Sequence, residues 1–73
     1  MNNNITSNYA MMLAIEYAGF NFEDTSDRHI AFSDGLYEIS FRTAFMSYEV
    51  YIDAANGEVL GCDFCPVRAC EAA

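Results

Sequence analysis

Residues 37–57, YEISFRTAFMSYEVYIDAANG, carry the clearest structural pattern in this chain. In the first half of this stretch, Tyr37, Ile39 and Phe41 alternate with polar side chains. Its second half repeats the alternation, with apolar side chains at every other position: Tyr48, Val50, Ile52 and Ala54. A period of two predicts strands with one buried and one solvent-facing side. Two such strands, separated by a short break and followed by Asn56-Gly57, predict an antiparallel meander.

Bond chemistry has little support in these residues. The stretch holds no nucleophile, base or metal cluster, and the chain has a single histidine, His29, beside Arg28. One histidine without a suitable nucleophile does not make a catalytic triad. We therefore expect a platform that presents a surface, and no enzyme activity.

A helix is expected over residues 5–19. Thr6 or Ser7 can cap its start, and Gly19 suits the left-handed position that ends a helix. One apolar stripe recurs at helical spacing: Ala10, Leu13, Ala14 and Tyr17. Three more apolar side chains lie off that stripe: Met11, Met12 and Ile15. Two interpretations stay open, a wide core contact with a tolerated surface methionine, or a second contact surface.

The strands before and within the quoted stretch can be placed by their turns. A short first strand is expected over residues 28–32, then a turn at Ser33-Asp34-Gly35 and a strand over residues 36–43. The break at residues 44–47 favours a four-residue loop, which sets Arg42 opposite Glu49. Phe45 at the tip of this loop is hard to explain as core, so it joins the candidate contact surface.

The last hairpin leaves two alternatives for the strand after it. A two-residue turn at Asn56-Gly57 would place Val59, Gly61 and Asp63 inward. A three-residue loop with Gly57 left-handed in a bulge would instead place three bulkier residues inward: Leu60, Cys62 and Phe64. We favour the second because it buries bulk and exposes an acid. Asp53 is expected to bond the backbone of its own turn.

These elements predict an α+β fold, with one N-terminal helix packed on a three- to four-stranded antiparallel meander sheet. We expect a disordered N-terminus over residues 1–4, a single domain over residues 5–65, and a tail over residues 66–73 that begins where Pro66 ends the last strand.

Composition narrows the partners. The net charge is -8, from 3 basic and 11 acidic residues, so phosphate backbones and anionic membranes would repel the chain and nucleic-acid binding is not expected. The hydrophobic fraction of 53% is high for one small core and implies a partner or self-association.

No window has the roughly 18–20 apolar residues of a membrane span. The N-terminus lacks a basic signal-peptide region, which predicts a cytoplasmic chain or an excised domain.

Three cysteines lie near the C-terminus: Cys62, Cys65 and Cys70. The first two form a C-x2-C pair, whose thiolates a turn could bring to one metal ion. Zinc would still need a fourth ligand, and a strand end before Pro66 is a poor setting for a redox pair. We favour structural cysteines, and we expect no cofactor.

With these elements in place, the sequence resembles the PepSY domain from Ile5 to about Leu60. The matching positions are Ile5-Thr6, Ala10, Ala14, Ala18-Gly19, Tyr37-Glu38-Ile39, Phe41-Arg42-Thr43, Tyr48-Glu49-Val50, Ile52-Asp53-Ala54 and Gly57-Glu58-Val59-Leu60. The resemblance implies a helix on an antiparallel sheet and a non-catalytic role. Such domains occur in propeptides of secreted metallopeptidases and in membrane-attached or secreted bacterial proteins, and they are thought to restrain peptidases or bind protein segments.

Our first functional hypothesis is a non-enzymatic module that binds a protein or peptide partner, or restrains a peptidase. It would use the exposed sheet face, which carries Tyr51, or an unpaired sheet edge. The alternative is a homodimeric structural domain that buries four apolar side chains: Met11, Met12, Ile15 and Phe45. A second alternative is a metal or redox protein that uses Cys62, Cys65 and Cys70.

Overall fold

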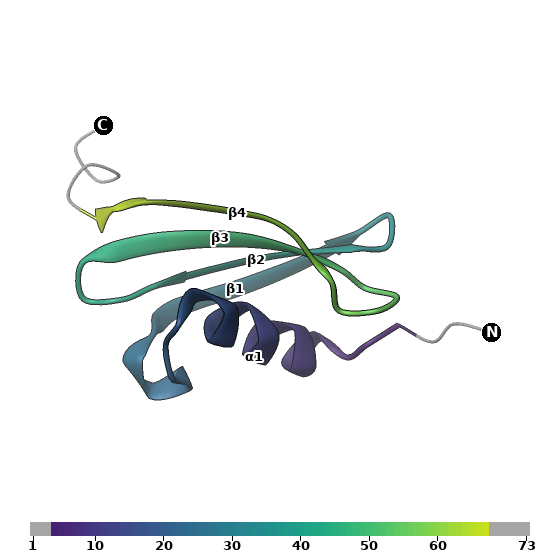
Figure 1. Ribbon diagram of the computed structural model, residues 1–73, viewed down its shortest axis with the longest axis horizontal. Coiled ribbons are helices and arrows are strands. Elements are labelled where there is room, and N and C mark those ends of the chain that lie inside the picture. The colour runs from purple at the N-terminus through teal and green to yellow at the C-terminus, as the bar shows by residue number, and fades with distance from the viewer. Residues whose placement is uncertain (1–3, 68–73) are drawn as a thin grey trace.

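The computed structural model describes residues 4–67, which form one helix and a four-stranded antiparallel sheet (Figure 1). The elements, in chain order, are α1 (Ser7–Ala18), the 3-10 helix η1 (Phe22–Asp24), β1 (Ser26–Ser33), β2 (Leu36–Arg42), β3 (Met46–Asp53) and β4 (Val59–Pro66). The strand order is β1-β2-β3-β4, so each strand pairs with its neighbour in the chain. The predicted fold class, an N-terminal helix on an antiparallel meander, is confirmed. The predicted disorder of residues 1–4 and the predicted tail concern segments that lie mostly outside the described residues.

Both ends of α1 have the expected caps. Oγ1 of Thr6 accepts a hydrogen bond of 3.1 Å from the backbone N–H of Tyr9, so Thr6 rather than Ser7 is the N-cap. Gly19 ends the helix with a φ of 91°, and its N–H donates to the carbonyl oxygen of Glu16. A side chain at that φ would be strained, which is why glycine ends the helix here.

The helix packs on the two central strands, β2 and β3, through a face that differs from the predicted stripe. Ala10 and Ala14 are fully buried, as expected, and Ile15 is buried with an exposed fraction of only 2%. Tyr17, by contrast, is exposed. Met11, Ala14, Ile15 and Ala18 follow the i, i+3, i+4, i+7 spacing, and this set faces the sheet. The predicted stripe was therefore wrong at Tyr17 and Ile15.

The β1–β2 hairpin has the predicted turn. Asp34 and Gly35 have φ values of 53° and 75°, and they connect the paired residues Ser33 and Leu36. Positive φ at both central residues is typical of the type I′ turn, whose twist matches that of the flanking strands.

The β2–β3 hairpin has a different register from the one predicted. Arg42 lies opposite Ser47, and Glu49 lies opposite Ser40. Thr43 closes the loop, because its N–H donates to the carbonyl oxygen of Met46 at 2.8 Å and its Oγ1 accepts from the N–H of Met46 at 3.2 Å. The predicted Arg42–Glu49 pairing is wrong by two residues. An even shift leaves each side chain on its expected face, so the core pattern survives.

The β3–β4 hairpin matches neither predicted turn. The N–H of Asp53 donates to the carbonyl oxygen of Glu58 at 2.8 Å, which leaves residues 54–57 as the loop. Gly57 is left-handed, as expected, with a φ of 79°. The Asp53 carboxylate accepts a 2.8 Å hydrogen bond from the N–H of Ala55, which confirms its predicted role in the turn.

A β-bulge in β4 sets which of its residues face the helix. Ile52 pairs with Val59 and Tyr51 pairs with Gly61, so the register shifts around Leu60. Val59 and Cys62 therefore both pack against the core, whereas Leu60 is exposed. Placing Cys62 inward was correct, and placing Leu60 inward was wrong. The bulge adds one residue, which reverses the alternation between those two positions.

The core lies between α1 and the inner face of the sheet, by which we mean the face that α1 covers; the opposite side is the outer face. The buried apolar residues are Ala10, Ala14, Ile15, Tyr37, Ile39, Phe41, Val50, Ile52 and Ala54. The chain before α1 is fastened to this core. Tyr37 donates its hydroxyl proton to the carbonyl oxygen of Ile5 at 2.8 Å, and the N–H of Ile5 donates to the carbonyl oxygen of Ala54 at 2.8 Å.

Candidate functional site

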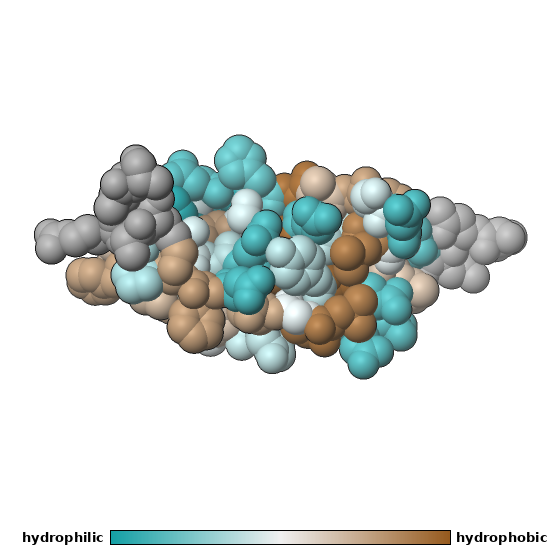
Figure 2. Space-filling view, turned by 90° about the horizontal axis from the view of Figure 1, so that it is seen from above, coloured by the Kyte–Doolittle hydropathy of each residue, from teal (hydrophilic) through white to brown (hydrophobic). Residues whose placement is uncertain are grey.

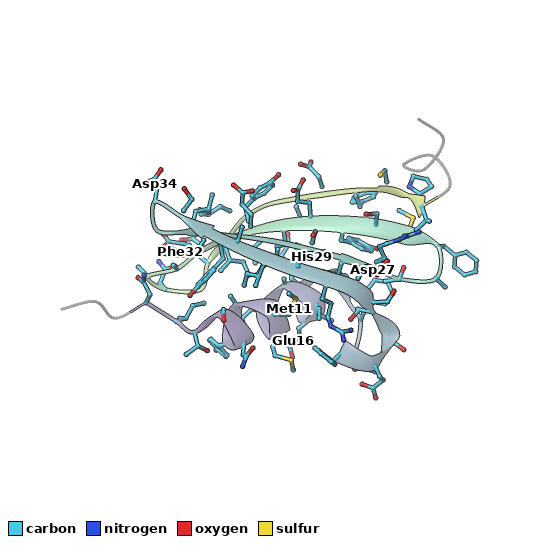
Figure 3. All side chains as sticks on the ribbon, turned by 180° about the vertical axis from the view of Figure 1, so that it is seen from behind. Met11, Glu16, Asp27, His29, Phe32 and Asp34 are labelled. Atoms are coloured by element: carbon cyan, nitrogen blue, oxygen red, sulfur yellow. The ribbon has the colours of Figure 1, made fainter. Side chains whose placement is uncertain are left out.

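Strand β1 lies at an open edge of the sheet, and none of its 8 residues is buried. Figure 3 shows it in the foreground, with Phe32, His29 and Asp27 along it and Met11 and Glu16 on the helix below. A helix with its side chains is about 10 Å wide, and strands lie about 4.8 Å apart, so one helix covers about two strands. In this fold those strands are β2 and β3, and the inner face of β1 stays uncovered.

Two apolar side chains lie on that uncovered face. Ile30 pairs with Ile39 and has an exposed fraction of 37%, against 0% for Ile39. Phe32 pairs with Tyr37 and has an exposed fraction of 52%, against 8% for Tyr37. The rings of Phe32 and Tyr37 lie 5.1 Å apart, so Phe32 is anchored on one side and open on the other. We call Ile30 and Phe32 the edge pair.

The backbone of the edge pair is also open. In a two-residue hairpin, the residues that flank the turn form a hydrogen-bonded pair, and such pairs alternate with non-hydrogen-bonded ones. Ser33 flanks the turn, so Ser33, Ala31 and His29 direct their N–H and C=O groups toward β2. Ile30 and Phe32 direct theirs away from the sheet. The same two residues thus offer both apolar side chains and free ladder positions.

The open run is limited at both ends. The turn at Asp34-Gly35 closes one end. At the other end, the register shifts between Ser26 and His29, where Asp27 has a φ of 50°. The carboxylate of Asp27 accepts a 3.3 Å hydrogen bond from Nη1 of Arg42. Because bulges bend an edge strand out of a regular ladder, the regular part of the edge is residues 29–33.

Arg28 fastens the start of β1 to η1. Its Nη1 donates to the carbonyl oxygen of Thr25 at 2.6 Å and to Oγ1 of Thr25 at 2.9 Å. Its guanidinium lies 3.8 Å from the centre of the Phe22 ring, a cation–π contact. These contacts hold β1 against the rest of the molecule although its side chains are exposed.

The outer face carries a group of acids around Tyr51. A hydrogen bond to Glu49 raises the pKa of the Tyr51 phenol, and the carboxylates of Glu49, Asp63 and Glu38 raise that pKa further. Figure 2, seen from the side opposite α1, shows hydrophilic residues across the middle of this view with hydrophobic ones on either side. Glu38 and Glu49 were expected on the solvent-facing side. Asp63 joins them only because of the bulge in β4.

A second apolar surface lies at the end of the sheet that carries the β2–β3 loop. Phe45 at the tip of this loop has an exposed fraction of 81%, in agreement with its predicted position outside the core. Phe64 of β4 is also exposed, and its ring lies 6.0 Å from that of Tyr48. Tyr48 in turn stacks on Phe41 and meets the edge of Phe20. Phe64 thus extends the core aromatic group to the surface.

The three predicted contact residues of the helix differ in their burial. Met12 is exposed, near Glu16 and Phe22 at the rim of a shallow pocket. Met11 is partly buried and packs against the core. Ile15 is buried, so its assignment to a partner surface was wrong, because the i+4 position from Met11 faces the sheet. No single surface contains Met11, Met12 and Ile15.

The cysteines of the C-x2-C motif lie on opposite sides of β4. Cys62 pairs with Val50 and packs against the core, whereas Cys65 pairs with Ser47 of the outer face. Residues three apart in a strand point in opposite directions, so the turn expected to bring both sulfurs to one metal is not formed. Cys65 is disulfide-bonded and Cys62 has a free thiol. Burial raises the pKa of the Cys62 thiol, with a smaller effect from Asp63. Cys70 lies outside the described residues.

Two absences hold for residues 4–67. No three His, Cys, Asp or Glu side chains in that range come together so that they could hold a metal ion. No helix in the same range is long and apolar enough to cross a membrane.

The edge pair was not singled out from the sequence, although Ile30 and Phe32 fall in the predicted first strand. The widths of a helix and of a four-stranded sheet could have indicated an uncovered edge. One helix about 10 Å wide covers about two of the four strands, so at least one edge had to stay open. Which edge that would be depends on the lateral position of the helix, which the sequence pattern does not give. Comparison of the chain with family models, curated proteins and solved structures gives no match.

Proposed function

We propose that this protein is a non-enzymatic interaction module, and that it binds an extended polypeptide segment as an additional strand along β1. One observation carries the proposal. The edge pair combines outward-facing backbone groups with uncovered apolar side chains at alternate positions. Strand addition uses these two features together, because backbone hydrogen bonds supply affinity and alternate side chains supply specificity.

Native proteins usually protect an open edge. Common devices are charged side chains that point inward, prolines, short strands and bulges. In β1 the bulge at Asp27 protects one end only, and the inner face of residues 29–33 carries isoleucine and phenylalanine. An edge whose residues 29–33 lack these protective devices supports a role in pairing with another strand. The partner segment would carry apolar side chains at alternate positions, so that they extend the inner face beside Ile30 and Phe32.

The resemblance of the sequence to the PepSY domain supports the same class of function. Domains of that family are thought to restrain peptidases or to bind protein segments, and the strands that carry the resemblance form the sheet that ends in β1. A peptidase or its propeptide-binding region is accordingly one source of the partner segment. The resemblance also favours a role without bond chemistry.

Selection from a library of random peptides displayed on phage tests the proposal. Selection on the wild-type protein should enrich peptides with apolar residues at alternate positions. Binding of these peptides should disappear in Ile30→Pro, which removes an outward N–H on an edge strand where proline is tolerated. In Ile30→Thr the N–H remains and only apolar surface is lost, so binding should weaken but persist.

Ile30→Lys serves as a second blocking variant in case the proline destabilises β1. A lysine on the inner face of an edge strand opposes pairing, and the exposure of position 30 lets its amine reach water. The proposal is wrong if the selected peptides bind wild type, Ile30→Pro and Ile30→Lys equally well, or if selection enriches no peptide.

A further inference from the structure

We propose that the strand added along β1 is β1 of a second copy of this chain, so that two molecules form one continuous antiparallel sheet about a two-fold axis at Ala31. This inference rests on the proposed function and names the partner. A symmetric pairing of this kind needs an edge that is complementary to itself, and residues 29–33 have that property.

The limits of the open run select the register. Antiparallel pairing of β1 with itself can be centred on several residues, but the turn at Asp34 and the bulge at Asp27 disrupt most of these arrangements. With the axis at Ala31, every pair falls within residues 29–33. The outward backbone groups of Ile30 then meet those of Phe32 in the second copy, which makes hydrogen-bonded pairs on both sides of the axis.

The side chains fit this register. On the inner face, Ile30 of each copy lies beside Phe32 of the other, and the two edge pairs form one apolar cluster. On the outer face, Ala31 meets Ala31 of the second copy, and neither side chain is bulky. At each end of the paired run, Arg28 of one copy comes next to Asp34 of the other.

Electrostatics also favours this edge for self-association of an acidic chain. Near this edge, Arg28 of β1 and Arg42 of β2 balance Asp27 of β1 and Asp34 of the turn, whereas two of the acids around Tyr51, Glu49 and Asp63, lie on β3 and β4. Glu38 is the nearest of these acids, opposite Ala31. In the proposed pairing the two Glu38 positions are three strand spacings apart, about 14 Å. That distance exceeds the Debye length of about 8 Å at physiological salt, so salt screens their repulsion.

The proposed interface is small. It consists of a short strand pairing and one apolar cluster, which lies below the standard interface area of about 1,600 Å². We therefore expect a weak dimer, monomeric near 10 µM and increasingly dimeric toward about 1 mM.

Cross-linking tests the register directly. Ala31 of the two copies would form a non-hydrogen-bonded pair, in which the Cβ atoms approach closely enough for a disulfide. In a Cys62→Ala background under diamide oxidation, Ala31→Cys should give a covalent dimer, and peptide mapping should find position 31 linked to position 31. The exposure of Ala31 on the outer face makes this change compatible with folding.

Two matched controls use neighbouring positions on the same face. Ser33→Cys alone should not cross-link, because position 33 pairs with position 29 and the two 33 positions are about 14 Å apart. A mixture of His29→Cys and Ser33→Cys proteins should form the mixed dimer. Cross-linking of Ser33→Cys as fast as Ala31→Cys would overturn the register, because it would indicate random collision.

Sedimentation over the same concentration range separates this inference from the proposed function. A wild-type protein that stays monomeric to about 1 mM, with no disulfide in Ala31→Cys, overturns the dimer. If peptides that need the N–H of Ile30 still bind such a monomer, the proposed function stands without the dimer. If they do not bind either, both proposals are wrong.

Discussion

Ile30 and Ile39 lie opposite each other on the inner face of the sheet, yet Ile39 is fully buried and Ile30 has an exposed fraction of 37%. The two residues are identical and occupy neighbouring strands. They differ in burial, because α1 packs on β2 and β3 and does not cover β1. The boundary between the covered and the uncovered part of the inner face therefore runs between β1 and β2.

This boundary predicts unequal effects of the same substitution. Ile39→Ala removes fully buried methyl groups and should lower the free energy of unfolding by about 2–4 kcal/mol, whereas Ile30→Ala should lower it by less than about 1 kcal/mol. Urea titration at low protein concentration measures both changes. Equal losses for the two variants would show that α1 covers β1 as well.

Gly57 should be more sensitive to substitution than Gly35. Both have positive φ, 79° and 75°, so alanine strains either one by about 1 kcal/mol. A Cβ at Gly57 would also lie 3.0 Å from Cδ1 of Leu13, while a Cβ at Gly35 meets nothing within 4 Å. Thermal unfolding should give a lower midpoint for Gly57→Ala than for Gly35→Ala. The reverse order would contradict the close approach of this loop to the helix.

The hydrogen bond from Tyr37 to Ile5 should have a measurable share in stability. Tyr37→Phe removes the donor and should cost about 1 kcal/mol of unfolding free energy, with faster proteolysis of the segment before α1. Tyr48→Phe is the matched control, because the Tyr48 hydroxyl makes no hydrogen bond among the described residues. If both variants lose the same amount, the Tyr37 contact has no special role.

The sequence predicts those features of the fold that depend on residues close together in the chain. Alternation along residues 37–54 identified the inner face of β2 and β3, and Thr6 and Gly19 identified the ends of α1. These are local signals. The predicted register of the β2–β3 hairpin was wrong, because a loop closed by the side chain of Thr43 has no simple sequence signature.

Three features that depend on residues far apart in the chain were not predicted. The bulge around Leu60 decides which residues of β4 face the helix. The burial of Ile15 and the exposure of the edge pair depend on where α1 lies on the sheet. That position is set by packing of many side chains together. The exposure of Asp63 was predicted, whereas its place among the acids around Tyr51 was not, because the pairing of β4 with β3 depends on the bulge.

Cys62 should react slowly with alkylating reagents. Burial raises the pKa of its thiol above the ordinary value of 9.0, so less thiolate is present at neutral pH. Iodoacetamide labelling followed by peptide mapping should give a rate that rises with pH to an inflection above 9.0, and a much faster rate in urea. An inflection below that value would indicate an activated cysteine.

The same pKa shift has a consequence for stability. The folded protein binds the thiol proton more tightly than the unfolded chain, so this contribution is fully present below about pH 9 and is lost as the pH rises through the folded-state pKa. Unfolding free energies measured in this alkaline range should fall more steeply for wild type than for Cys62→Ala. Parallel curves would contradict the shift.

Amide hydrogen exchange at β1 can show whether the edge pair accepts an added strand. In the isolated monomer, the N–H groups of Ile30 and Phe32 point away from the sheet and should exchange fast, while that of Ala31 is bonded to β2 and should be protected. When a strand is added, by raising the protein concentration or by adding a selected peptide, we expect new protection at Ile30 and Phe32 with little change at Ala31. Fast exchange at Ile30 and Phe32 under every one of these conditions would contradict the proposed strand addition.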